Sequence, residues 1–303
     1  MRWTKMLFSA NSPSDDRSPN VSPPTGAPIS EPLHRVRADG RIAVTSSMRD
    51  GVSRVTRCEE RGGYRVRFPR RGDIPSGIMI NTGGGLCSGD RLAIDATATD
   101  GASLEMTTQA AERIYRSGDG ARTDVTTTLQ AGEGSALRWL PQETILFDRS
   151  RLRRRFDVDL AASATFLAVE TLVFGRAAMG ETLRDAHYQD QWRVRRGGAL
   201  LYADAVRLAG DVAAELARPA VASGARVLSL IVYSAPAASE RADQVRRALS
   251  IDDADAQGHA GVTGWGELLL VRALAPSVET MRQLTAKAIT ELSGTPPPRA
   301  WNT

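Results

Sequence analysis

Five acidic residues lie in or beside apolar stretches of the 303-residue sequence, where an isolated negative charge is costly to bury. They are Asp90, Glu112, Glu143, Glu170 and Glu181. Such carboxylates either form ion pairs with arginines such as Arg113 or Arg176, or line a hydrated path through the interior. A β-rich hydrolase that uses two of them as its acid and base is a further alternative. The residues alone leave all three interpretations open.

Two of these glutamates lie in segments that are near copies of each other. Gln142–Phe147 reads QETILF, and Val169–Phe174 reads VETLVF. We expect the two segments to occupy the same phase of an internal repeat. Glu143 and Glu170 would then be equivalent positions in successive units.

The glycine-rich segment Asn81–Asp90 (NTGGGLCSGD) does not fit a dinucleotide-binding loop. The third glycine of that motif is replaced by Ser88, and the residues that follow alternate as a strand instead of opening a helix. We therefore expect a bulged connection between strands. Cys87 has no histidine near it in the sequence, so we expect a small buried thiol and not a nucleophile. The chain also lacks a P-loop, which argues against nucleotide hydrolysis.

Composition is that of an ordinary globular protein, with 42% hydrophobic residues and a mean hydropathy of −0.26. The net charge of +4 is modest and does not by itself indicate nucleic-acid binding. The arginine run at 149, 151 and 153–155 has no interleaved aromatic residues, so we expect a solvated face or a protein contact. Two cysteines, three histidines and no long apolar run predict a cytoplasmic protein without a zinc site or a membrane span.

Alternation of apolar and polar residues is the main structural signal. It predicts strands at 64–68, 91–98 and 188–194. Short turns that each precede another strand recur at 101–104, 134–137, 163–166 and 224–227, which is consistent with layers of strands wound one on another. The predicted fold is mainly β, with a β-helix-like winding of strands and a few peripheral helices.

The helical signals lie in the last quarter of the chain. Ser277 can cap a helix over 277–293 that presents Met281, Leu284 and Ile289 on one face and ends at Gly294. A fainter helix follows Ser239. Residues 1–35 are rich in proline and serine and predict a disordered tail, followed by a single domain over 36–295 and a flexible C-terminus over 296–303.

Four stretches together resemble the UreD family of urease accessory proteins, called UreH in some bacteria. They are Asn81–Asp90, Thr107–Ser117 (TTQAAERIYRS), Leu140–Phe147 (LPQETILF) and Val173–Glu181 (VFGRAAMGE). The resemblance covers roughly residues 40–293, with the order and spacing of the motifs intact. Members of this family usually have a further glycine where this chain has Ser88, and often no cysteine at position 87.

The resemblance implies a non-enzymatic role in urease maturation. Such proteins act with UreF and the GTPase UreG on the urease apoprotein, and an internal tunnel would carry nickel, so no tightly bound cofactor is expected. Tight nickel sites favour imidazole or thiolate ligands, which are scarce here, so passage fits better than storage. The candidate residues for a nickel path are Asp90, Glu170 and Glu181, and Cys87 and Met179 are weaker candidates. A second set is expected to contact partner proteins or to form structural motifs: Glu112, Arg113, Glu143, Arg176, Met281 and Leu284.

Overall fold

The strands predicted from alternation are present, and they assemble into two facing sheets. The computed structural model describes residues 37–69, 74–250 and 258–302. Within these residues the smaller sheet, sheet A, has seven strands, which in spatial order are β14 (Ala199–Gly210), β13 (Ala186–Arg196), β11 (Arg151–Leu160), β8 (Thr123–Ala131), β5 (Arg91–Ala98), β1 (Asp39–Arg49) and β2 (Val52–Arg61). The predicted tail lies outside the described residues.

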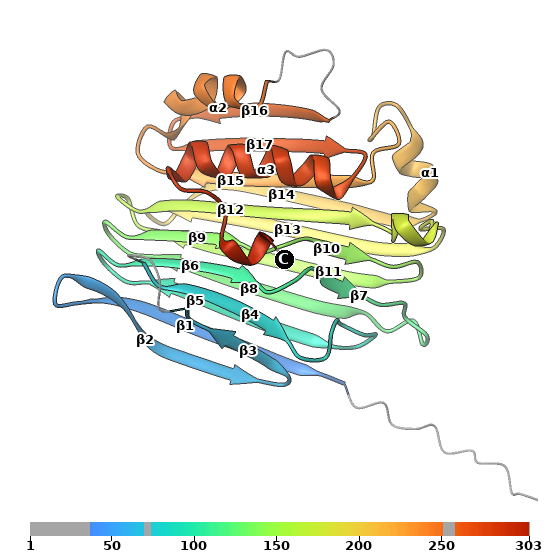
Figure 1. Ribbon diagram of the computed structural model, residues 1–303, viewed down its shortest axis with the longest axis horizontal. Coiled ribbons are helices and arrows are strands. Elements are labelled where there is room, and N and C mark those ends of the chain that lie inside the picture. Colours follow the sequence, from blue (N-terminus) through green and yellow to red (C-terminus); the bar gives the residue numbers. More distant parts are fainter. Residues whose placement is uncertain (1–36, 70–73, 251–257, 303) are drawn as a thin grey trace, which may run out of the picture. The chain divides into compact units, whose positions relative to one another are not determined.

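The larger sheet, sheet B, faces sheet A (Figure 1). Among the described residues it has ten strands. Its main path runs through β16 (His259–Trp265), β17 (Leu268–Ala275), β15 (Val227–Ser234), β12 (Thr165–Phe174), β9 (Ala136–Leu140), β6 (Ser103–Thr108), β4 (Ser76–Asn81) and β3 (Tyr64–Arg67). Two short strands extend it beside β12, namely β10 (Thr144–Leu146) and β7 (Glu112–Ile114).

The middle of the chain winds between the two sheets as a coil of parallel strands. Strands β1, β5, β8, β11 and β13 run parallel in sheet A, and β4, β6, β9 and β12 run parallel in sheet B. Short turns carry the chain from a strand of one sheet to a strand of the other. Antiparallel pairs flank the coil, formed by β2 and β3 at one side and by β14, β15, β17 and β16 at the other. The predicted mainly β, β-helix-like winding is therefore confirmed.

The register of sheet B shows which parts of the internal repeat are structural. Leu104 pairs with Leu137, and Leu137 pairs with Phe166, so three repeat positions stack across β6, β9 and β12. All three side chains are buried between the sheets. The fourth repeat does not continue the stack, because β15 is antiparallel to β12 and places Val227 opposite Val173.

The predicted C-terminal helix is α3 (Val278–Ser293), which covers the outer face of sheet B. The Ser277 hydroxyl caps its first turn by accepting a hydrogen bond from the Thr280 amide, and Gly294 ends it with a φ of 71°. The helix after Ser239 is present as η2 (Ala238–Arg241) and α2 (Ala242–Ala248). The remaining helical segments of the described residues are α1 (Val212–Ala217), η1 (Ala177–Met179) and η3 (Arg299–Asn302).

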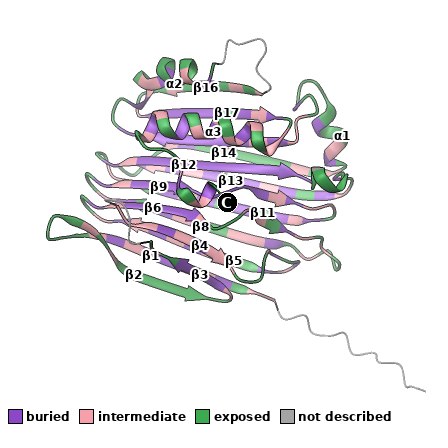
Figure 2. Ribbon diagram, in the orientation of Figure 1, coloured by how far each residue is buried: buried purple, intermediate pink, exposed green. Residues whose placement is uncertain are grey.

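The core has two layers because sheet B is covered on both faces near β12, β15 and β17. The first layer fills the space between the sheets and contains Phe166, Leu137 and Trp192. The second lies between sheet B and the helices and contains Leu167, Ile289 and Trp301. Strand β12 is consequently buried along nearly its whole length, while β2 and β14 are largely exposed (Figure 2).

Residues 296–303 were predicted to be flexible, but the part of this stretch that the structure describes contains a short helix that packs on sheet B. Residues 299–302 form η3, and the Trp301 side chain is 7% exposed. Its indole Nε1 donates a hydrogen bond to the carbonyl of Leu140 at 3.0 Å. The three consecutive prolines before it predicted disorder, but a large aromatic side chain gains more from burial than the short segment loses in entropy.

We predict that Leu137→Ala will destabilise the protein by about 2–5 kcal/mol, because Leu137 is 1% exposed between two stacked neighbours and would leave a cavity. Leu200→Ala is the matched control, since Leu200 is 58% exposed on β14 and should cost less than about 0.5 kcal/mol. Urea unfolding of both variants measures the difference. Equal stabilities would show that the stacked column is not part of the stable core.

Candidate functional site

A buried arginine lies at the centre of the space between the sheets. Strand β11 alternates, and Leu152, Arg154 and Phe156 all point inward, whereas Arg153 and Arg155 are exposed. The sequence-based expectation of a solvated arginine run therefore holds for the exposed neighbours and is wrong for Arg154, which is 5% exposed. A guanidinium in this position requires charged partners close by.

Those partners come from three other strands and form what we call the Arg154 cluster: Arg154, Glu170, Asp190, Tyr188 and Trp139. Arg154 donates from Nη1 to Glu170 Oε2 at 2.5 Å, and from Nη2 to Asp190 Oδ2 at 2.7 Å and the Tyr188 hydroxyl at 2.6 Å. The Trp139 indole donates to the other oxygen of Glu170 at 2.6 Å. Parallel pairing of β11 with β13 places Asp190 directly beside Arg154, so the contact follows from strand register.

The cluster contains two carboxylates and one guanidinium, and some of its polar atoms have no partner. Asp190 Oδ1 and Arg154 Nε are buried without a hydrogen bond to any described residue. Desolvation raises the pKa of Glu170 even though the charge of Arg154 opposes it. Burial by itself lowers the pKa of Arg154, but the charges of Asp190, Tyr188 and Glu170 outweigh it and raise that pKa. These buried groups have unused hydrogen-bonding capacity facing the interior.

Cavities lie on both sides of the Arg154–Glu170 ion pair. The larger, about 420 Å³, is lined mostly by apolar side chains of β12, β14, β15 and α1, with the Asp204–Arg272 ion pair (2.8 Å) also in its wall. On the other side a small cavity of about 60 Å³ is also lined by Arg154 and Glu170 and reaches Glu112. A third cavity, of about 140 Å³, shares Glu112 with the second and reaches Tyr64 and Asn81.

Glu112 is the second interior carboxylate with an altered ionisation. Asn81 Nδ2 donates to it at 2.8 Å and the Tyr64 hydroxyl at 3.4 Å. Desolvation outweighs these hydrogen bonds and raises the pKa of Glu112 to about 7, from an ordinary value of 4.5. Glu112 is therefore a group that exchanges a proton near neutral pH. Arg113, one of the arginines offered above as an ion-pair partner for the glutamates, is exposed and forms no ion pair with any described residue.

The other predicted nickel-path carboxylates are occupied by local contacts. Asp90 is 5% exposed, and its two oxygens accept the backbone amides of Ala38 (2.8 Å) and Cys87 (2.7 Å). Glu181 accepts from Arg176 Nε at 2.9 Å, and this contact lowers the pKa of Glu181. Ion pairing with Arg176, one of the alternatives set out above, is thus what Glu181 does.

Two weaker candidates lie at the surface. Cys87 is exposed, so the expectation of a buried thiol is wrong. The preceding residue, Leu86, is the one whose side chain is buried. Met179 lies in η1 and is 72% exposed. Among the described residues, no group of three or more His, Cys, Asp and Glu side chains is arranged to hold a metal ion.

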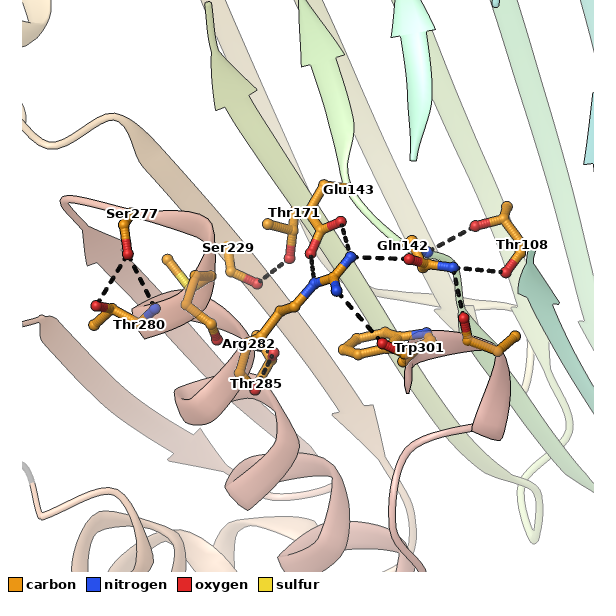
Figure 3. Close-up of polar contacts among 12 residues, drawn as sticks. Thr108, Gln142, Glu143, Thr171, Ser229, Ser277, Thr280, Arg282, Thr285 and Trp301 are labelled. Atoms are coloured by element: carbon orange, nitrogen blue, oxygen red, sulfur yellow. Dashed lines mark hydrogen bonds and ion pairs between the residues drawn. The ribbon is translucent and has the colours of Figure 1, made fainter. Parts of the chain in front are cut away.

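Glu143 lies on the opposite face of sheet B from Glu170. It is 4% exposed and binds Arg282 of α3 through both oxygens, at 2.6 and 2.9 Å (Figure 3). The register explains the difference, because Thr144 pairs with Leu172 and not with Thr171, one residue away from the phase that the near copies predicted. A shift of one residue reverses the face of a strand.

Residues around this ion pair fasten the helix and η3 to sheet B. Gln142 accepts from Arg282 at 2.9 Å and donates to the carbonyls of Gln109 and Ala300 (Figure 3). Met281 is buried, and Leu284 is half-buried against the same layer. The apolar stripe of α3 therefore packs on sheet B, so Met281 and Leu284, which were expected to be partner contacts or structural residues, have a structural role.

Sequence reasoning missed Arg154, Asp190 and Trp139. The signal for Arg154 was present, since it occupies an inward position of an otherwise apolar alternation. Asp190 likewise alternates with Tyr188 and Trp192 on β13. Which strands would be neighbours was not visible in the sequence, so the partners could not be matched.

Comparisons with known proteins agree on one family. The family model described as "UreD urease accessory protein" matches residues 38–302. A urease accessory protein UreD from Xanthobacter autotrophicus is 45% identical over 280 residues, which cover 92% of this chain and 95% of the relative. UreD proteins from a Methylobacterium species (43% identical, 89% and 96% covered) and from Azorhizobium caulinodans (45%, 88% and 97%) are similar to the same extent.

We predict that Glu112→Gln will change how stability depends on pH. A carboxyl whose pKa is raised in the folded state stabilises the fold fully below pH 4.5, and this contribution is lost as the pH rises toward 7. The free energy of unfolding of the variant, relative to that of the wild type, should therefore increase by about 2 kcal/mol between pH 5 and pH 8. This is less than the shift in the pKa of Glu112 would give in full, because water partly reaches the side chain. Denaturant unfolding at both pH values measures it. Glu240→Gln, at an exposed site, is the control, and parallel profiles would show that Glu112 is ionised normally.

Proposed function

The chain belongs to the UreD family of urease accessory proteins, and from this premise we propose that it helps nickel reach the urease active site. It binds the urease apoprotein together with UreF and UreG, acts in the cytoplasm as a non-catalytic chaperone, and holds nickel as cargo. None of the helices in the described part of the chain combines the length and the apolar character needed to cross a bilayer.

The observation that carries this proposal is the succession of cavities between the sheets. The large cavity adjoins the small one at Arg154 and Glu170, and the small one adjoins the third at Glu112. Carboxylates therefore mark both junctions between neighbouring cavities. An ion moving between the sheets would meet an oxygen ligand at each junction, with apolar walls between them.

The chemistry of these groups suits transfer better than storage. Carboxylate and carbonyl oxygens are harder and weaker nickel ligands than imidazole or thiolate. Glu170 and Asp190 share their negative charge with Arg154, so a divalent cation competes with a guanidinium for them. That competition keeps the residence time of the ion short. Asp190 Oδ1, which has no partner among the described residues, is the oxygen that an arriving ion can bind first.

Glu170 is accordingly the predicted path residue that we favour. Glu181, in its ion pair with Arg176, lies in the segment that follows β12 and η1, and would act where an ion leaves the strands. Asp90, Cys87 and Met179 stay predictions, with Asp90 tied to two backbone amides and the other two at the surface. The hydrolase alternative has no comparable support, because the two carboxylates of the Arg154 cluster bind the same guanidinium and leave no separate acid and base.

We predict that Glu170→Gln will keep the complex with UreF and urease assembled while lowering the nickel delivered to urease. The amide keeps the shape and can still accept the Trp139 hydrogen bond, but it removes the anionic ligand, so delivery should fall on the order of tenfold. Glu181→Gln, alone and combined with Glu170→Gln, tests the second site. The measurement is nickel bound per urease and urease activity in cells that lack the chromosomal copy of this gene.

Glu240→Gln, on an exposed helical turn, controls for the loss of one negative charge. Co-purification measures assembly, and thermal unfolding measures the fold of each variant. Normal nickel delivery by the double variant would remove these residues from the path. A loss that merely follows disassembly of the complex would do the same.

A further inference from the structure

The four motifs that carry the family resemblance meet at one edge of sheet B, where the parallel strands β7, β10 and β12 end. Leu86, Ile114, Leu146 and Phe174 lie side by side, because an isolated bridge joins the first two and parallel pairing joins the rest. Each of the last three ends its strand. The loops that follow β7, β10 and β12 therefore leave the sheet together, where the arrowheads of β7 and β10 point in Figure 1. The proposed nickel path reaches these loops at Glu181, but it does not account for the convergence of all four motifs.

These loops enclose a surface hollow of about 480 Å³ that we call the arginine edge. Its wall contains Tyr115, Arg116, Phe147, Asp148, Arg149, Arg176 and Glu181. Tyr115 packs edge-on against Phe147 with ring centroids 5.0 Å apart, and the Arg176 guanidinium lies over the Phe147 ring at 4.3 Å. The Tyr115 hydroxyl donates to the carbonyl of Gly84 at 3.0 Å, which ties in the glycine-rich motif. The hollow is thus built on a fixed aromatic base.

Both carboxylates of the arginine edge are already committed. Glu181 binds Arg176 and accepts from the Asp148 amide at 3.2 Å. Asp148 Oδ1 accepts the amides of Arg184 and Asp185 at 2.8 and 3.1 Å. The positive charges of two exposed arginines, Arg116 and Arg149, are therefore not neutralised by close contacts with these carboxylates. Arg116 forms no ion pair with any described residue, and Arg149 forms a long ion pair, with its Nε 4.0 Å from Asp148 Oδ2.

The backbone of Arg149 adds an independent observation. Its φ is 62°, a left-handed conformation that a long side chain adopts at a cost of roughly 1–2 kcal/mol. Its carbonyl is held by the amide of Ser117 at 2.8 Å, and the side chain is 68% exposed. Asparagine or glycine would fit this conformation with less strain. Strained backbone positions are often associated with function, and at this one the Arg149 guanidinium is exposed and accessible for contact.

We propose that the arginine edge binds an acidic segment of a protein partner in the urease assembly, with Arg116 and Arg149 contacting its carboxylates. Guanidinium groups bind carboxylates through paired hydrogen bonds, and arginine and aromatic residues are enriched where protein interfaces gain most of their affinity. A nucleic-acid partner fits less well, because Arg176 and Tyr115 cover the Phe147 ring and leave no platform for a base to stack on. This inference rests on the proposed function for the existence of the partner.

The test uses the full chain and measures its binding to immobilised urease apoprotein and, separately, to UreF, at low and at high salt. Arg116→Glu/Arg149→Glu should weaken binding to one of these proteins by about tenfold or more at low salt and reduce its salt dependence. Arg149→Asn, which suits the left-handed backbone, should weaken the same interaction by a few-fold without loss of thermal stability.

Arg49→Glu/Arg54→Glu is the matched control. It makes the same change in net charge at exposed arginines of the β1–β2 hairpin, at the other end of the strands, and should change binding by less than about twofold. Wild-type affinity in the Arg116/Arg149 variant, or an equal loss in the control, would overturn the inference while leaving the proposed function intact. Failure of the wild-type chain to bind either protein would overturn both. Competition by an oligonucleotide, but not by a polyglutamate peptide, would contradict an acidic protein partner.

Discussion

Neutralisation of one buried guanidinium is the constraint around which the two sheets are arranged. Arg154 projects from sheet A into a largely apolar space, and an uncompensated charge there would cost several kcal/mol. Asp190 on the adjacent strand and Glu170 on the opposite sheet both form ion pairs with this guanidinium and neutralise its charge. The ion pair between Arg154 and Glu170 therefore connects the two sheets and fixes the position of one along the other. A shift of either sheet along its strands would separate the charges.

The parallel winding explains why such a cluster can form at all. In a coil of parallel strands, each residue is next to the equivalent residue of the following turn, so Arg154 and Asp190 become lateral neighbours although 36 residues separate them in the chain. The same stacking places Leu104, Leu137 and Phe166 in one column. Charged and apolar residues are thus placed by the same strand register. Arg154 and Asp190 occupy two adjacent positions in a row that continues with the apolar residues Val125 and Leu92.

The sequence allowed the class of fold, the main strands and both C-terminal helices to be predicted, because alternation and capping are local signals. Pairing between strands is not local, and the errors follow from that. Glu143 and Glu170 looked equivalent, but a displacement of one residue between β9 and β10 directs them to opposite faces of sheet B. Arg154 was predicted to be exposed like the other arginines of its run, because the inward position that it occupies in the alternation was not recognised. Trp301 was discounted because prolines precede it, although its indole fits against Leu140.

The position of Trp301 has a consequence for the order in which the protein assembles during synthesis. Its indole contacts Thr107 on β6, 194 residues earlier in the chain, and the neighbouring carbonyl of Ala300 binds Gln142. Turns of the coil can close one after another as the nascent chain leaves the ribosome, since each needs its predecessor alone. Until η3 is in place, the outer face at Thr107 and Leu140 has no indole to cover it. Because η3 follows every strand in the sequence, its contacts with β6 and with Gln142 form after the strands that they cover.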